Sequence, residues 1–272
     1  MTSGIKSGSG VDPERKGSTF TYGPYNTASV APGTVYPITV RYEFTHPIIA
    51  VSLLERDVEV SHWGGNLATE ERYWMHNNGS KLLGGFSRVQ WTISKYNGDA
   101  TNALRELNYP LKSGSVDPYY TDDIGNVTTS NYRPGRRAHL SFQPRYPLFG
   151  GWNYSFRIGW NNALSSFLRK SAQDADKYIL KVPFIEGPDM PEGVQYEKVV
   201  VQVILPEGAR DLDFGILEQE KLNGLPGSNA FRVTVTNHKT YMDTLGRTVL
   251  EVWVDNLTDS ARNSQLLVRT YI

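Results

Sequence analysis

Hydrophobic and polar positions alternate along most of this chain, in short runs. Residues 57–63 place Val58 and Val60 on one side and Glu59 and Ser61 on the other, because successive side chains of a strand point to opposite faces. Similar runs, rich in β-branched and aromatic residues, are 35–44, 48–54, 71–76, 86–92, 138–143, 154–159, 178–184, 196–205, 231–236, 248–254 and 266–271. The pattern predicts a mainly β chain.

Turn-forming residues separate these runs. The turn signals are Gly64-Gly65, Asn78-Gly79, Asn97-Gly98, Gly150-Gly151, 206–208 and 245–247. Helical patterns are few: 161–170, with Asn161 or Asn162 as cap, and the weaker 100–107. Many short strands between Gly and Pro turns favour an antiparallel, β-sandwich-like domain with few short helices.

The chain divides into a leader and one large domain by composition. Residues 1–17, rich in Gly and Ser, predict a flexible leader or linker, and 18–272 a single β-rich domain. Residues 186–193 form a Pro, Gly and acidic stretch, interpreted as a long loop or a hinge between two sheet layers, with the loop favoured. No apolar run reaches the roughly 18–20 residues of a membrane span, and no signal peptide opens the chain. A strand-like pattern runs to its last residues, so we expect a piece of a longer protein.

Charge and cysteine content narrow the function classes. Lys plus Arg and Asp plus Glu number 28 each, so the net charge is zero. Such a balance gives no general attraction to nucleic acid or to an anionic membrane. The chain has no cysteine, which excludes disulfides, thiolate metal sites and cysteine nucleophiles.

Motifs for catalysis are missing from the sequence. It contains no G-x-x-x-x-G-K-[ST], no G-x-S-x-G and no H-E-x-x-H. No two histidines are separated by a spacing typical of metal ligands. His62 and His76 nevertheless lie on neighbouring predicted strands and could face each other. Histidines hydrogen-bonded in or near the sheet are the favoured interpretation. We therefore predict no catalytic residue, no metal site and no cofactor.

The adjacent acidic pairs in the sequence also predict neither a catalytic site nor a metal site. Glu70-Glu71 and Asp122-Asp123 are adjacent in sequence, and neighbours in a strand point to opposite faces, so neither pair can jointly flank a substrate bond. The loop around the second pair holds a third aspartate, Asp117. These oxygens could bind Ca²⁺, but the EF-hand pattern is missing. A solvated acidic loop is favoured.

One modification motif recurs. The sequence N-x-[ST] begins at Asn78, Asn126, Asn153 and Asn256, and each could accept an N-glycan if exposed in the endoplasmic reticulum. Asn126 and Asn78 lie in turn contexts and are the best candidates. Asn153 falls within a predicted strand, which counts against it.

The aromatic content permits a sugar-binding interpretation. However, most tryptophans fall within strand patterns, where large aromatic side chains usually pack in the core. The six are Trp63, Trp74, Trp91, Trp152, Trp160 and Trp253. Core packing is favoured for each, with Trp63 filling the end of a strand.

Five segments together resemble the ribophorin I family. They read EVSHWGGN at 59–66, DIGNVTTS at 123–130, PRYPLFGGW at 144–152, VILPEGA at 203–209 and YMDTLGR at 241–247. The resemblance runs from about residue 20 to the end. PRYPLFGGW and EVSHWG are specific, and VILPEGA alone would not be. The family usually has one Gly before the Asn of its SHWG segment, so Gly64-Gly65 implies a longer turn there.

The resemblance implies a role without a reaction. It implies the second luminal part of a non-catalytic oligosaccharyltransferase subunit, anchored in the endoplasmic reticulum membrane by a span outside this chain. The expected partners are other subunits, including the catalytic one, and nascent polypeptides. The family sequon implies glycosylation at Asn126. The prolines and glycines of PRYPLFGGW themselves predict a corner between sheets, anchored by Phe149 and Trp152, which is favoured over a partner-contact loop.

Two rival functions stay open. One is a glycan- or peptide-binding module of the secretory pathway. Aromatic side chains exposed in a groove would favour this module, whereas buried tryptophans would favour the non-catalytic subunit scaffold. The other is a hydrolase with a dispersed site, which needs a pocket joining His62 or His76 to a carboxylate of perturbed pKa.

Overall fold

The computed structural model falls into two compact units, Met1–Thr45 and His46–Ile272. It describes residues 4–7, 14–17, 19–22, 33–35, 38–41, 44–61, 63–98, 101–174, 176–217, 231–239, 241 and 246–271. In the first unit, β1 (Gly4–Ser7) pairs antiparallel with β4 (Ile38–Arg41), and β2 (Glu14–Lys16) with β3 (Thr19–Thr21). Two of these strands fall inside the predicted leader, and its boundary at residue 17 stays a prediction.

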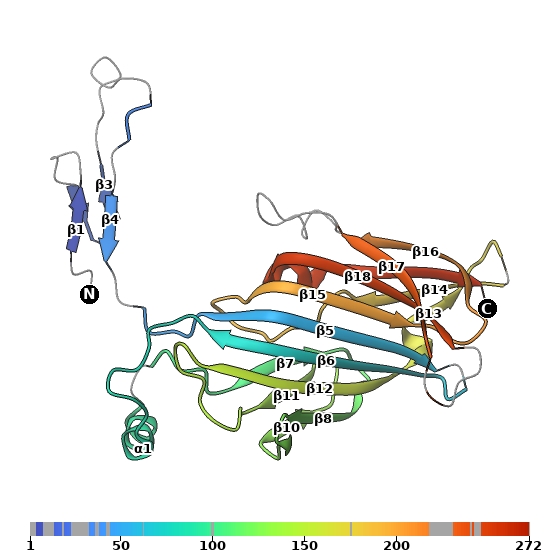
Figure 1. Cartoon of the computed structure of the whole chain (residues 1–272), viewed down its shortest axis with the longest axis horizontal. Helices are drawn as coiled ribbons and strands as arrows, with labels where there is room; N and C mark the ends of the chain where they lie inside the picture. The colour runs from blue at the N-terminus through green and yellow to red at the C-terminus, as the bar shows by residue number, and fades with distance from the viewer. Residues whose placement is uncertain are drawn as a thin grey trace. The chain divides into compact units, whose positions relative to one another are not determined.

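An eight-stranded sheet dominates the second unit (Figure 1). Its order is β17 (Arg232–His238), β18 (Arg247–Thr258), β15 (Gln195–Ile204), β5 (Ile49–Ser61), β6 (Asn66–Asn77), β12 (Asn153–Ala163), β8 (Val116–Asp122) and β9 (Gly125–Asn126). All these neighbours pair antiparallel except β15 and β5, which are parallel.

Two smaller sheets complete the unit. One has the order β10 (Ser130–Arg133), β11 (Ala138–Phe142) and β7 (Leu107–Leu111); the other has the order β13 (Leu168–Lys170), β14 (Lys177–Pro183), β19 (Gln265–Tyr271) and β16 (Arg210–Leu217). Among the described residues the helices are α1 (Arg88–Asn97) and the 3₁₀ turns η1 (Leu164–Ser166) and η3 (Asp259–Asn263). Within the described residues, none of the helices has the length and apolar character of a membrane-spanning helix.

The core lies between the large sheet and the smaller ones. Tyr73 of β6 meets Tyr109 of β7 with ring centroids 5.8 Å apart, and Phe156 of β12 meets Phe142 of β11 at 5.4 Å. Buried residues of the four-stranded sheet, such as Val268, belong to the same cluster. Burial of one such side chain stabilises the fold by about 1.5–3 kcal/mol. The predicted mainly β, sandwich-like architecture is confirmed.

The segment 86–92 is the clearest error, because the predicted strand is the start of helix α1. The Oγ atom of Ser87 accepts a hydrogen bond from the backbone of Gln90, and Gly98 ends the helix in the left-handed conformation. These caps outweigh the β-branched composition, since no residue of the helix is buried.

Both predicted helices are wrong. Asn161 and Asn162 continue β12 instead of capping a helix, because their amide groups bond across the sheet: Asn66 donates to Asn161 at 2.8 Å, and Asn162 donates to Ser115 at 3.1 Å. Ala163 ends β12, and η1 and β13 follow within 161–170. Within the described part of 100–107, Leu104 forms a β-bridge with Leu148 before β7 begins.

Other segments differ in detail. Residues 49–54 and 57–61 of two predicted strands belong to one continuous strand, β5, and much of the predicted acidic loop is the β8–β9 hairpin. Trp63 does not fill a strand end, because it stands in the β5–β6 turn with 92% of its surface exposed. The stretch 186–193 is an irregular connection from β14 to β15 in which Glu186 and Met190 are buried.

Candidate functional site

The segment 144–152, called here the corner segment, leads from β11 in the small sheet to β12 in the large one. Phe149 is buried and Trp152 packs against the core. A Cβ atom on Gly150 would lie 2.2 Å from the carbonyl oxygen of Ser80, so only glycine fits there. The predicted corner between sheets is confirmed.

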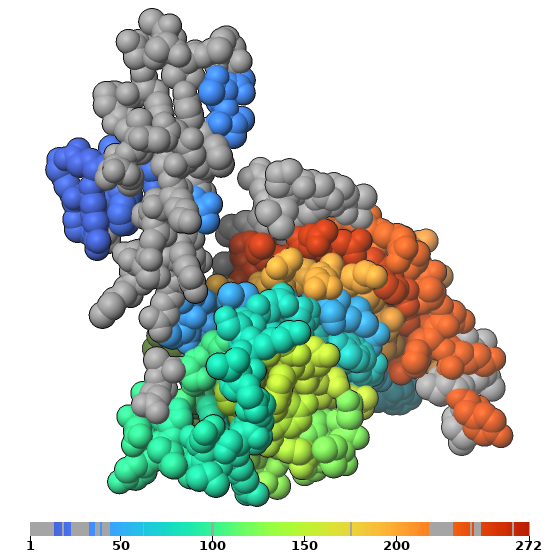
Figure 2. Space-filling model, turned by 60° about the vertical axis from the view of Figure 1, so that its left-hand side comes forward, coloured from blue at the N-terminus to red at the C-terminus, as the bar shows by residue number. Residues whose placement is uncertain are grey.

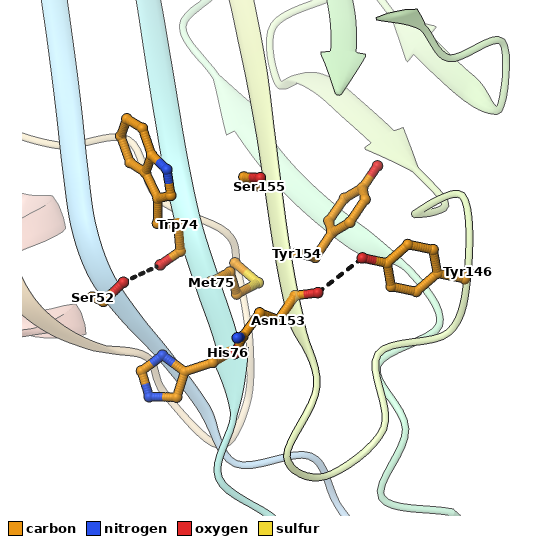
Figure 3. A pocket seen from close by; sticks show the side chains of 8 residues that line it. All are labelled: Ser52, Trp74, Met75, His76, Tyr146, Asn153, Tyr154 and Ser155. Atoms are coloured by element: carbon orange, nitrogen blue, oxygen red, sulfur yellow. Dashed lines mark hydrogen bonds between the residues drawn. The ribbon is translucent and has the colours of Figure 1, made fainter. Parts of the chain in front are cut away.

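An open cavity of about 400 Å³ lies beside the corner segment (Figure 3). Trp74 and Tyr146 stand at its two sides, 39% and 37% exposed. The Tyr146 hydroxyl donates to the Asn153 carbonyl at 2.9 Å, and the Ser52 hydroxyl donates to the Trp74 carbonyl at 3.1 Å. The lining residues are Ser52 of β5, Trp74, Met75 and His76 of β6, Tyr146, and Asn153, Tyr154 and Ser155 of β12.

The hydroxyl groups of this cavity are held by hydrogen bonds within the protein. Ser52 donates to backbone and Ser155 to the Asp123 carboxylate, so neither hydroxyl is paired with His76. The His76 imidazole lies 3.7 Å from Glu197 instead. The Tyr154 hydroxyl donates to the Asp122 carboxylate at 3.3 Å, and no hydroxyl of the described lining residues is hydrogen-bonded to an imidazole, the usual base of a serine nucleophile. Aromatic faces beside hydrogen-bonding groups suit stacking on a ring or a peptide.

A second cavity, of about 530 Å³, is rich in basic residues. Glu186 lies in its wall, and burial raises the pKa of this carboxyl to about 7, although the nearby Arg56 acts to lower it. Arg262 donates to the Glu186 carbonyl at 3.0 Å and to Asp189 at 3.0 Å. The other charged lining residues are Lys112, Arg136, Arg137 and Asp259.

Behind Glu186 lies a buried charge cluster. Arg56, 1% exposed, pairs with the fully buried Glu71 and lies 3.6 Å from Glu186. The Tyr73 hydroxyl donates to Glu71 at 2.6 Å, and the Glu186 backbone N–H donates to the same carboxylate at 3.2 Å. The Arg56 guanidinium faces the Trp160 ring at 5.8 Å. This cluster ties β5 and β6 to the 186–193 connection.

The neighbouring Glu70 points the other way. It accepts from Arg72 at 2.8 Å on the outer face of the large sheet, where Arg157 lies 3.3 Å away. Arg72 also pairs with Glu55 and Asp57 of β5. The prediction that Glu70 and Glu71 cannot act on one substrate bond is confirmed.

The predicted solvated acidic loop is structured around Asp122. Arg145 donates two hydrogen bonds to this carboxylate, at 2.6 and 2.9 Å, and the backbone N–H groups of Ile124 and Gly125 donate at 3.0 Å. These donors, Arg145 first, lower the pKa of Asp122 to about 2. In the described part of the chain, no three or more acidic or histidine side chains converge as a metal site.

The histidines are dispersed. His62 lies outside the described residues, and with it the arrangement in which it could face His76. His46 lies 2.8 Å from Glu192, and His139 bonds Asn108 at 3.1 Å.

All four sequon asparagines are exposed. Asn126 is in the short edge strand β9, and Asn78 follows β6. Asn153 begins β12 at the cavity of Figure 3, and Asn256 lies near the end of β18 with a positive φ of 56°. Sequence reasoning found Asn153 but missed the cavity, because nothing in sequence joins Ser52 to Tyr146.

The tryptophans divide between core and surface. Trp160 is 2% exposed, as expected of a core residue, whereas Trp63 and Trp74 are exposed. Trp91, Trp152 and Trp253 are partly buried. The prediction of core packing is therefore wrong for Trp63 and Trp74.

Comparisons with known proteins point to one family. The family model described as Ribophorin I matches residues 2–271. Subunit 1 of the dolichyl-diphosphooligosaccharide–protein glycosyltransferase of Schizosaccharomyces pombe is 32% identical over 91% of this chain and 52% of its own length. Subunit 1B of Arabidopsis thaliana is 34% identical over 93% of this chain and 51% of its own.

The similarity to solved structures is weak. An M1 zinc metallopeptidase from Deinococcus radiodurans has a TM-score of 0.43 and 12% identity, covering 81% of this chain and 42% of that one. A likeness at that level supports no conclusion about function.

The curated relatives are longer than this chain, which spans about half the length of the two named above. The family model, by contrast, covers nearly all of it, including the first unit. Together with relatives above 30% identity over most of the chain, this match shows that the chain belongs to the ribophorin I family.

Proposed function

We propose that this chain is a non-catalytic luminal part of an oligosaccharyltransferase subunit in the endoplasmic reticulum. It supports N-linked glycosylation by contact with other subunits, including the catalytic one, and with nascent polypeptides. The observation that carries the proposal is the family match over residues 2–271, together with relatives named as glycosyltransferase subunit 1. In the intact protein a membrane span outside this chain anchors the domain.

The geometry of the Figure 3 cavity supports binding over reaction. Its hydroxyl groups are bonded to backbone and to the side chains of Asp122, Asp123 and Tyr120, and its exposed groups are aromatic or amide. The perturbed carboxyl, Glu186, lies in a different cavity, beside arginine and lysine side chains. His76 and Glu186 therefore do not share the pocket that a dispersed hydrolase would need.

The sequons are the proposed modification sites. We rank Asn126 first, because it is exposed in an edge hairpin and matches the family sequon, and then Asn78, Asn256 and Asn153. A glycan on Asn153 would stand at the mouth of the Figure 3 cavity and would compete with any ligand there.

A second function, a glycan- or peptide-binding module, is favoured by the exposure of Trp74 and Tyr146 in one groove. The buried Trp160 favours the scaffold instead. The two functions are compatible if the groove serves substrates while another face meets the subunits.

The test is a pull-down from microsomes in mild detergent, with the tagged domain restored to its membrane-anchored protein. We expect recovery of the catalytic subunit with both the unchanged domain and Trp74→Ala. Glycoprotein substrates should decrease only in Trp74→Ala, and Trp63→Ala serves as a matched control with an exposed tryptophan elsewhere.

Recovery of glycoproteins without the catalytic subunit would refute the scaffold and leave the binding module. Equal substrate recovery with Trp74→Ala and Trp63→Ala would remove the groove from either role.

A further inference from the structure

Residues 81–98, called here the α1 segment, project from the second unit. They lie between β6 and β7, away from the large sheet in Figure 1, and the segment stands at the molecular surface in Figure 2. No residue of helix α1 is buried. A ten-residue helix without a buried face gains little from packing within the chain.

One side of the helix is nevertheless fastened to the protein. The Trp91 ring lies 5.2 Å from Phe149 of the corner segment, and the Arg105 guanidinium lies 4.8 Å over Trp91. Just before the helix, Phe86 contacts Phe149 and Trp152, each at 5.7 Å. These rings fix which side of α1 faces the protein.

The opposite side carries an apolar ridge. Val89, Ile93 and Tyr96 follow the i, i+4, i+7 spacing of one helix face and are 69%, 54% and 92% exposed. Trp91, two positions after Val89, lies on the far side of the helix at 3.6 residues per turn. The fully exposed Leu83 precedes the helix. Single exposed apolar residues are ordinary, but a contiguous ridge marks an interaction surface.

All the charged residues of the α1 segment are basic. It holds Lys81, Arg88 and Lys95 and neither Asp nor Glu. All three basic residues are exposed, and the ion pairs of the described residues include none of them. The zero net charge of the whole chain therefore conceals a locally cationic segment.

We propose that the α1 segment lies on the surface of a lipid bilayer, with its apolar ridge in the interface and its basic residues beside anionic headgroups. A short helix with one apolar face, lysine and arginine, and aromatic residues has the properties of an interfacial helix. Gly84 and Gly85, both with φ above +75°, bend the chain between the exposed Leu83 and the helix. Lipid fits better than a protein partner, because cationic charge without any acidic residue complements an anionic surface.

This contact is distinct from the membrane anchor of the proposed function and does not require the complex. The test is flotation of the whole 272-residue chain with vesicles of phosphatidylcholine alone or of phosphatidylcholine with phosphatidylserine. We expect binding to the mixed vesicles, weakened by salt. Val89→Ser/Ile93→Ser/Tyr96→Ser should lower the partition coefficient by more than about tenfold.

Two matched variants separate charge from apolar contact. Arg88→Gln/Lys95→Gln should reduce binding to the mixed vesicles and leave binding to neutral vesicles unchanged. Ile124→Ser/Val235→Ser, which removes exposed apolar side chains elsewhere, should change neither. Thermal unfolding of each variant should match the unchanged chain, because none of these side chains is buried.

Hydrogen exchange locates the contact. Protection on vesicles confined to residues 82–98 supports the proposal. Absence of vesicle binding, equal binding of the ridge variant, or protection elsewhere overturns it. Self-association that the ridge variant abolishes would assign the face to a second copy of the chain.

Discussion

The two faces of the large sheet hold charge in opposite ways, and β6 shows both. Its Glu71 points inward and is fully buried with Arg56, while its Glu70 points outward and shares Arg72 with two acidic residues of β5. The outer groups are partly hydrated, with Arg72 36% exposed. One step along a strand thus separates a desolvated ion pair from a surface network.

The buried and the exposed ion pairs differ most in how much stability is lost when one partner is removed. Removal of one partner from a buried pair leaves an uncompensated charge, which costs about 3–5 kcal/mol. Exposed pairs contribute about 0–1 kcal/mol and are screened by salt. Adjacent glutamates should therefore respond to the same substitution by very different amounts.

The largest effect is expected for Glu71→Gln. The substitution keeps the side-chain shape but leaves Arg56 with Glu186 alone, at 3.6 Å. We expect a loss of about 3–5 kcal/mol in the free energy of unfolding, measured by urea denaturation. A loss below about 1 kcal/mol would show that the interior is not desolvated there.

Glu186→Gln should alter the dependence of stability on pH. Burial raises the pKa of Glu186 from 4.5 to about 7, so the folded state holds this proton more tightly than the unfolded chain. The stability from the protonated carboxyl is fully present below pH 4.5 and is lost as pH rises to about 7. Its full size is of the order of 3 kcal/mol.

The glutamine variant has no such proton. Relative to the unchanged chain it should become more stable between pH 5 and pH 7.5, measured as the difference in unfolding free energy at each pH. A difference independent of pH would contradict the raised pKa.

The smallest effect is expected for Glu70→Gln on the outer face. Arg72 keeps Glu55 and Asp57 as partners, so the loss should stay within about 1 kcal/mol. Added salt should reduce it further. Urea denaturation at low and high salt, beside Glu71→Gln as reference, measures both. A salt-independent loss comparable to that of Glu71→Gln would erase the contrast between the faces.

Period-two alternation made the strands of the large sheet predictable except β8 and β9, which fell in the predicted acidic loop, and it also separated Glu70 from Glu71. The same signal failed at α1, where Val89, Trp91 and Ile93 resemble a strand although Ser87 and Gly98 cap a helix. Asn97-Gly98 is a turn signal in sequence and a helix end in the structure. Local composition cannot decide between them when neither conformation is buried.

The candidate site depends on register, which sequence does not supply. The cavity of Figure 3 joins residues because Met75 pairs with Tyr154 and Val51 pairs with Met75 across three strands. The prediction of core packing for Trp63 failed for a related reason. The preceding strand was recognised, but the Gly64-Gly65 turn that follows decides whether the Trp63 side chain points inward. The net charge of zero likewise did not reveal the cationic α1 segment, because it is a sum over the whole chain.

The parallel pairing of β5 with β15 sets the order in which this domain can assemble. Ala50 pairs with Gln195, so the whole stretch between them must be synthesised before the seam closes. The β5–β6 hairpin and the β15–β18 pair connect nearer neighbours, and non-local pairings form more slowly than local ones. During translation the edge of β5 that β15 later covers therefore keeps its backbone N–H and C=O groups unpaired until a strand made much later arrives.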